Sequence, residues 1–124
     1  MYHIIHFKKK NHYYLPNFYI PNFFSFLIFQ YLTELKESGA RIIIGDFFKN
    51  AAQKVMCEAY KLHMTQKEGY VWFLPGWYHP DWYKLDDLRE LEVKKNNSEK
   101  NDQKESIPDC STDEMIQVKS KILL

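Results

Sequence analysis

The sequence predicts an α/β fold built on a strand–helix–strand unit of a parallel sheet, and three observations carry this prediction. Two short apolar runs, residues 42–44 and 70–74, enclose a stretch in which apolar residues recur at helical spacing. Continuous runs rich in β-branched and aromatic residues are typical of strands buried on both faces, as in parallel sheets. Parallel strands joined through a helix form a right-handed βαβ unit. Both strands need neighbours on each side, and we expect no other segment of the sequence to pair with them, so the domain should be incomplete.

The first expected helix lies just before this unit. Leu32, Leu35 and Lys36 are at helical spacing, and the pattern stops at Ser38 and Gly39. Glycine at that position is typical of a helix C-cap. Residues 41–45 then predict the first strand, buried on both faces.

The central helix of the unit follows. Asn50 is a candidate N-cap, because its side chain can accept a hydrogen bond from the first turn. The apolar residues that come next are spaced four, four and three apart: Ala51, Val55, Ala59 and Leu62. This spacing predicts one apolar helix face. Gly69 ends the connection, residues 70–74 predict the second strand, and Pro75-Gly76 closes that strand.

The last third of the chain changes character. Residues 94–105 consist of Lys, Asn, Glu, Asp, Ser and Gln, so we expect a solvated polar insertion at about residues 86–109. Beyond it, Ser111 or Thr112 can cap a helix. One face of that expected helix would carry Met115, Val118 and Ile122.

Residues 1–31 differ from the rest of the chain in composition. They contain 11 of its 21 aromatic residues and no Asp or Glu. Their longest apolar run, residues 23–29, is shorter than the roughly 20 residues of a membrane-spanning helix. The small-residue cleavage site of a secretory signal is also missing. We therefore expect two parts: an aromatic-rich extension at residues 1–31 and a partial lobe at residues 32–124.

Charge and motif content exclude several classes of function. The 124 residues carry 17 basic and 16 acidic side chains, a balance that argues against a nucleic-acid binder. Neither a Gly-rich phosphate loop nor a metal-ligand spacing among the five His and two Cys is present. Asp46 follows a strand but has no accompanying nucleophile and base. We expect no enzyme, no metal site and no cofactor.

Four stretches in order carry a specific resemblance: residues 40–45, 54–61, 70–78 and 110–115. Together they resemble the extracellular ligand-binding module of metabotropic GABA receptors of the GABA-B type. These are class C G-protein-coupled receptors whose two-lobed flytrap domain is similar to bacterial periplasmic amino-acid-binding proteins. In that family the region lies in the second, membrane-proximal lobe. The resemblance implies a partial periplasmic-binding-protein-like lobe.

The resemblance also implies two ligand contacts. Trp77 falls where the family places a ligand-facing indole, which can pack on an aliphatic chain and face an ammonium group. Phe48 falls where GABA-binding subunits carry a Tyr whose hydroxyl reaches the ligand carboxylate. Loss of such a hydrogen bond to a charged group costs about 1.5–3 kcal/mol, roughly one to two decades of affinity.

Further implications concern covalent features and partners. Cys57 and Cys110 match two cysteines that are disulfide-linked in the family, and Asn96 begins an N-glycosylation sequon. The implied function is to bind GABA or a related amino acid and, through a receptor heterodimer partner, to activate a G protein. The implied location is the extracellular side of the plasma membrane. The alternative is a soluble, non-signalling α/β binding or interaction protein.

Overall fold

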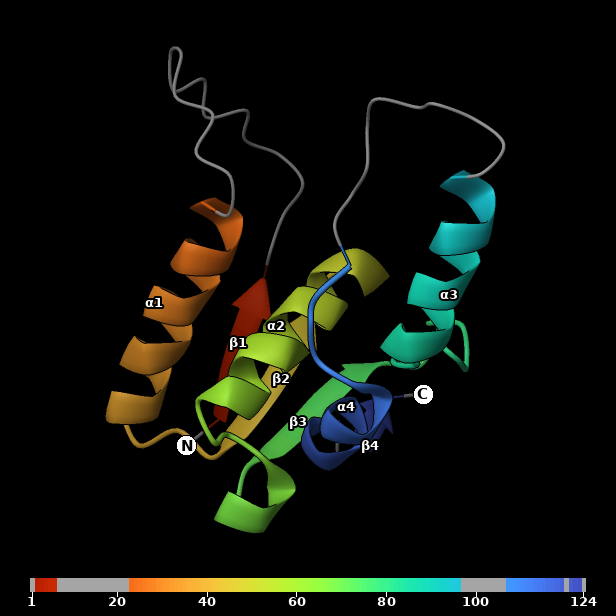
Figure 1. The fold of residues 1–124 in the computed structure, drawn as a ribbon. Coiled ribbons are helices and arrows are strands. Elements are labelled where there is room, and N and C mark those ends of the chain that lie inside the picture. Colours follow the sequence, from red (N-terminus) through yellow and green to blue (C-terminus); the bar gives the residue numbers. More distant parts are fainter. Residues whose placement is uncertain (1, 7–22, 97–106, 120, 124) are drawn as a thin grey trace.

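The computed structural model describes residues 2–6, 23–96, 107–119 and 121–123 (Figure 1). Its elements in chain order are β1 (Tyr2–His6), α1 (Phe23–Glu37), β2 (Ile42–Asp46), α2 (Lys49–Lys61), the short 3-10 helix η1 (Gln66–Glu68), β3 (Val71–Pro75), α3 (Leu85–Asn96), α4 (Thr112–Val118) and β4 (Lys121–Leu123). The expected α/β class with a βαβ unit is confirmed, since α2 joins the neighbouring parallel strands β2 and β3.

The four strands form one parallel sheet in the order β1-β2-β3-β4. The prediction that no other segment could pair with the two expected strands was therefore wrong. Tyr2–His6 pairs with β2 along its whole length, and Lys121–Leu123 pairs with β3. Pairing satisfies backbone N–H and C=O groups that an isolated strand edge would leave open.

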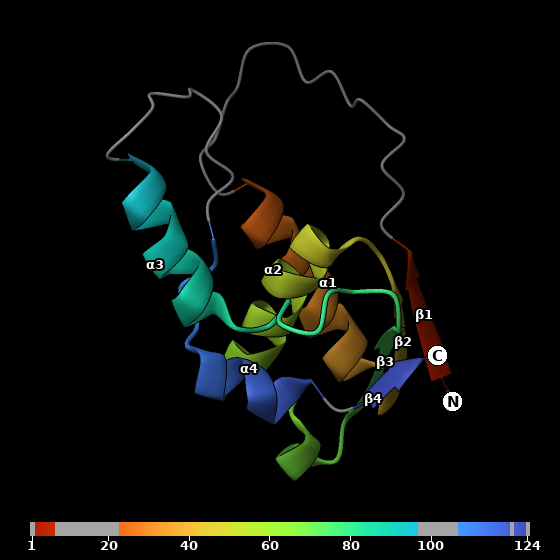
Figure 2. The same ribbon diagram turned by 90° about the vertical axis from the view of Figure 1, so that its right-hand side faces the viewer.

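The helices lie on one side of this sheet, as the side view in Figure 2 shows. Side-chain burial along the strands agrees with this layering. Ile43, Trp72 and Leu74 are buried beneath the helices, whereas Ile42 is 43% exposed and Phe73 is only partly buried. The expected burial of β2 and β3 on both faces is therefore wrong for the described chain. A continuous apolar run shows that a strand could be buried on both faces. Burial of the second face also requires another layer of structure to pack against it.

Helix α1 begins earlier than the sequence pattern indicated, at Phe23, and ends at Glu37 as expected. Its inner face consists of Ile28, Leu32 and Leu35, all buried in the core. Gly39 has a φ of 81°, the left-handed conformation that suits a residue beyond a helix C-terminus. The expected boundary between residues 31 and 32 falls inside α1. Whether residues 1–31 and 32–124 are separate domains stays a prediction.

The expected polar loop at residues 86–109 was wrong in its first part, because α3 continues to Asn96. Leu85 and Leu88 are three residues apart and face the core. Acidic residues in the first turn and basic residues in the last turn suit the helix dipole. Leu, Glu, Arg and Lys are all strong helix formers, so composition alone misled the prediction. Residues 97–106 of the expected loop lie outside the described part.

Helix α4 begins at Thr112 and has Ser111 as its N-cap, in a reciprocal capping box with Glu114. The expected capping near Ser111 is confirmed, and Met115 and Val118 are buried. The expected continuation to Ile122 was wrong, because the helix ends at Val118 and Ile122 lies opposite Leu74 in the sheet. A free edge of β3 competes with helix propagation, and there the strand pairing prevails.

Candidate functional site

The candidate ligand-binding residues stand where two neighbouring parallel strands end. β2 ends at Asp46 and β3 at Pro75, and ligands of α/β proteins bind outside the carboxyl ends of such strands. Phe48 follows β2 and occupies the N-cap position of α2, two residues before the expected cap Asn50. Trp77 follows β3 after Gly76. The topology therefore brings together two residues that are 29 positions apart.

Phe48 and Trp77 meet edge to face, with ring centroids 5.9 Å apart at an interplanar angle of 68°. Phe48 is 60% and Trp77 is 64% exposed, so both rings face solvent. We call these two residues the aromatic surface. Edge-to-face contact is a favoured geometry of aromatic pairs, and here it leaves more than half of each side chain exposed.

A buried aromatic layer supports the aromatic surface from below. Trp77 contacts Tyr78 with centroids 4.8 Å apart, and Tyr78 contacts Trp82 with centroids 5.4 Å apart. Both Tyr78 and Trp82 are buried. Gln53 of α2 donates a hydrogen bond from Nε2 to the Trp82 carbonyl at 2.8 Å. The exposed indole thus stands on side chains that cannot move independently of the core.

Tyr78 fixes the strand ends through its hydroxyl. That hydroxyl donates a hydrogen bond to the carbonyl oxygen of Phe47, the residue before Phe48. Burial, with a smaller contribution from the negative charge of Asp46, raises the pKa of Tyr78 well above its usual range. The phenol therefore remains a protonated donor at physiological pH. Sequence reasoning missed this residue, since its role depends on a carbonyl group from another strand end.

Close packing at the end of β2 also depends on Gly45. A Cβ atom at this position would lie 2.6 Å from Cζ of Phe47 and 2.9 Å from Cδ2 of Leu74. Any larger residue would have to displace one of these side chains. Gly45 therefore allows Phe47 to turn into the core, and Phe48 consequently points outward.

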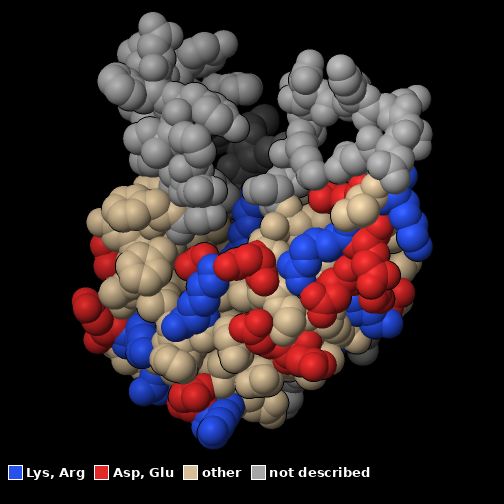
Figure 3. Space-filling view, viewed as in Figure 1, with Lys and Arg blue, Asp and Glu red and all other residues tan. Residues whose placement is uncertain are grey.

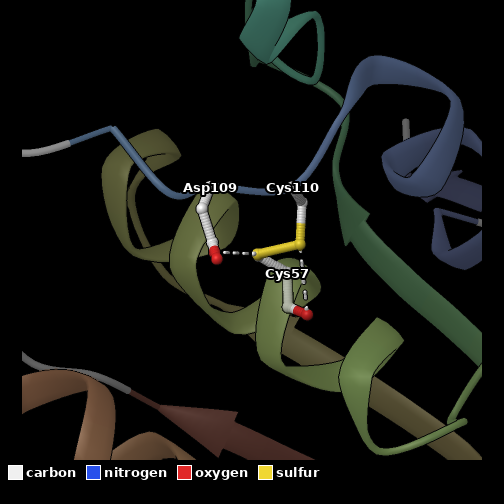
Figure 4. A group of neighbouring side chains, drawn as sticks. All are labelled: Cys57, Asp109 and Cys110. Atoms are coloured by element: carbon white, nitrogen blue, oxygen red, sulfur yellow. Dashed lines mark hydrogen bonds between the residues drawn. A yellow bond between two sulfur atoms is a disulfide. The ribbon is translucent and has the colours of Figure 1, made fainter.

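The disulfide implied by the family resemblance is present. Cys57 of α2 and Cys110, just before α4, are joined with an S–S distance of 2.01 Å and a Cα–Cα distance of 5.7 Å (Figure 4). Asp109 Oδ1 lies 3.6 Å from Cys57 Sγ. These three residues form the group with metal-ligand geometry among the described residues. Because the two sulfur atoms are bonded to each other, they cannot act as thiolate ligands.

The charged groups on the helical side of the molecule are interspersed rather than segregated by sign, as Figure 3 shows. A cavity of about 170 Å³ between α2 and α3 has the same mixed character. It is lined by Lys49, Asn50, Gln53, Lys54, Leu88, Glu92 and Ile107. Asn96 is the last residue of α3, and the two residues that complete its sequon lie outside the described part.

Comparison with known proteins identifies the family. Residues 15–121 match the model of the receptor family ligand-binding region. The chain belongs to this family. The gamma-aminobutyric acid type B receptor subunit 1 of Mus musculus and that of Rattus norvegicus are each 52% identical to it over 42 residues. That stretch is 34% of this chain and only 4% of the length of either relative.

These matches confirm the resemblance found in the sequence, a GABA-B-like member of the class C receptors. They also agree with the partial α/β lobe seen in the structure. The relatives are receptors rather than enzymes. Within the part of the chain that the structure describes, no helix combines the length and hydropathy needed to cross a lipid bilayer.

Proposed function

We propose that this chain is part of the extracellular ligand-binding region of a GABA-B-like receptor and that the aromatic surface contacts the ligand. The observation that carries the proposal is the meeting of Phe48 and Trp77, both more than half exposed, at the carboxyl ends of adjacent parallel strands. Large rings in such positions lose favourable burial unless a ligand or a second lobe covers them. The family match over residues 15–121 supports the same assignment.

The ligand class follows from the chemistry of the two rings. An indole face can pack on a short aliphatic chain and attract an ammonium group, and a phenyl ring adds a second apolar wall. A small ω-amino acid such as GABA, or a related amino acid, has both an aliphatic chain and an ammonium group. The phenyl ring of Phe48 offers no donor for the ligand carboxylate, so that group must be bound by other residues.

The signalling role proposed here is that of the family. A ligand that contacts both lobes favours the closed state, because its contacts are more numerous there than in the open state. Closure then acts on a receptor heterodimer partner and, through the membrane domain, on a G protein. The same role implies the extracellular side of the plasma membrane for this chain, and in that compartment Asn96 would accept an N-glycan.

A chimeric receptor tests the ligand assignment. Residues 23–119 of this chain replace the matching segment of mouse gamma-aminobutyric acid type B receptor subunit 1, and binding of radiolabelled GABA is measured. Phe48→Tyr restores a hydroxyl and should raise GABA affinity by about tenfold or more, whereas Trp77→Ala should lower it by at least tenfold. Phe26→Tyr is the matched control, since Phe26 is also 60% exposed but lies on α1.

The outcomes separate the proposal from its alternative. Equal GABA affinity in the parent chimera, the Phe48→Tyr variant and the Trp77→Ala variant would show that the aromatic surface is not in the ligand site. The genomic sequence on either side of this coding segment tests the receptor assignment independently. A first lobe upstream and seven apolar spans downstream support a receptor, and transcripts that end at Leu124 would instead support a soluble, non-signalling binding protein.

A further inference from the structure

The segment that carries Cys110 is bound to α3 through one arginine. Arg89 donates hydrogen bonds to the carbonyl oxygen of Pro108 at 2.5 Å and to that of Cys110 at 2.8 Å. The same guanidinium pairs with the carboxylate of Asp86, one turn earlier on α3. A planar guanidinium with several fixed donors is suited to hold two carbonyl groups and a carboxylate at once.

Asp86 completes this attachment by a reciprocal capping arrangement. Its carboxylate accepts a hydrogen bond from the backbone N–H of Thr112, the first residue of α4, at 2.9 Å. In return, the Thr112 hydroxyl accepts a hydrogen bond from the backbone N–H of Asp86 at 3.3 Å. Each helix start thus satisfies an N–H group that has no partner within its own helix. We call Asp86 and Arg89 the α3 clamp.

The opposite side of the same segment faces α2. Lys61 forms an ion pair with Asp109 at 2.9 Å, and Cys110 is bonded to Cys57. The α3 clamp therefore holds residues 108–112 from one side while α2 holds them from the other. Cys110 is 2% and Cys57 is 1% exposed, so their sulfur atoms meet only when this segment is seated.

We propose that the α3 clamp positions Cys110 against Cys57, so that disulfide formation does not depend on the sequence of residues 97–106. Those residues contain no large apolar side chain. The effective concentration of two thiols is set by how well the noncovalent structure holds them together, and by reciprocity the disulfide strengthens that structure equally. Asp86 and Arg89 act on the cysteines through the backbone and are positioning residues.

A redox titration of the full 124-residue chain tests this. Oxidised glutathione accepts two electrons and two protons from the thiols of Cys57 and Cys110, which yields one protein disulfide and two molecules of reduced glutathione. The equilibrium constant is the effective concentration of the thiol pair. Arg89→Gln and Asp86→Asn should each lower it by about tenfold. Asp87→Asn and Lys95→Gln, exposed positions on the same helix, should leave it unchanged.

A second variant tests the other half of the proposal. Replacement of residues 97–106 by a Gly/Ser segment of equal length should change the effective concentration by less than about threefold. A loss of about tenfold in this variant, or an unchanged constant in both Arg89→Gln and Asp86→Asn, would overturn the proposal. Arg89→Lys should recover part of the loss, because an ammonium group can reach only some of the same acceptors.

Hydrogen exchange on the oxidised variants distinguishes positioning from general destabilisation. If the α3 clamp acts locally, Arg89→Gln accelerates exchange of the Thr112 and Glu114 amides and leaves the amides of β2 and β3 protected. Equal acceleration in α4 and in the sheet would mean that Arg89 supports the whole fold, and the positioning role would be rejected.

Discussion

Two regions of the molecule hold their side chains in different ways. Around the Cys57–Cys110 disulfide, the chain is fixed by a covalent bond, by the α3 clamp and by the Lys61–Asp109 ion pair. At the aromatic surface, Phe48 touches Trp77 and Trp77 touches the buried Tyr78, but Phe48 and Trp77 each expose more than half of their area. The first region fixes the fold, and the second leaves aromatic side-chain area exposed to solvent.

The comparison shows that a rigid buried support and an exposed surface can come from residues adjacent in the sequence. Tyr78 is buried and hydrogen-bonded to the Phe47 carbonyl, while its neighbour Trp77 is open. A preorganised surface loses less conformational entropy on binding than a mobile one. The proposed ligand contact therefore depends on residues that never touch the ligand.

Removal of the disulfide should have the largest effect on stability. The bond closes a loop of 53 residues, so loss of both sulfur atoms in Cys57→Ala/Cys110→Ala should lower the free energy of unfolding by about 4 kcal/mol. Urea denaturation of the full chain measures this. Phe48→Ala is the matching variant at the aromatic surface and should lower the free energy of unfolding by less. A larger loss for Phe48→Ala than for removal of the disulfide would contradict the view that the disulfide region fixes the fold.

Two tryptophans offer a sharper version of the same contrast. Trp72 is fully buried and donates a hydrogen bond from Nε1 to the Met64 carbonyl at 2.9 Å. Trp72→Phe should cost about 1–3 kcal/mol, because it leaves a carbonyl unsatisfied and a void in the core. Trp77→Phe should change stability by less than about 0.5 kcal/mol. Comparable losses from urea denaturation would mean that Trp77 also serves the core.

Low pH should also lower the free energy of unfolding through the region around the disulfide, by less than the two changes above. The hydrogen bond and charge of Lys61 lower the pKa of Asp109 below its ordinary value of 3.8. The unfolded chain therefore takes up this proton first as the pH falls. The stabilising contribution is complete above about pH 4 and disappears as the pH drops through the lowered pKa.

A pH series of urea midpoints tests that sign. Asp109→Asn should remove part of the stability loss between pH 5 and pH 2, whereas Glu90→Gln, an exposed residue on α3, should leave the loss as it is. Asp86 contributes in the same direction, because the Thr112 amide and then Arg89 lower its pKa. A wild-type midpoint that rises as the pH falls would contradict the assignment.

Local patterns in the sequence predicted those elements whose signals are local. The run at residues 42–44 identified β2, and the spacing from Ala51 to Leu62 identified α2. The expected cap at Ser111 or Thr112 marked the start of α4, and the structure shows that Ser111 is the N-cap. The resemblance, rather than residue spacing, implied the Cys57–Cys110 pair and the positions of Phe48 and Trp77.

Features that depend on tertiary contacts were not predictable in this way. Tyr2–His6 has no strand signal strong enough to be recognised without β2 beside it, and Ile122 belongs to a helical pattern until the edge of β3 is available. The α3 clamp likewise depends on residues 19 to 26 positions apart meeting in space. Sequence spacing does not encode that meeting.

The placement of the helices on one side of the sheet has a practical consequence for anyone preparing this polypeptide. Ile42, Ile44, Val71 and Phe73 belong to the side of the sheet opposite the described helices, where hydrophobic surface promotes precipitation. Lysine or glutamate at the most open of them, Ile42, would improve solubility without touching the layer beneath α1 and α2. The alternation of exposed and buried residues along β2 thus indicates that a charge is tolerated at Ile42 and not at the buried Ile43.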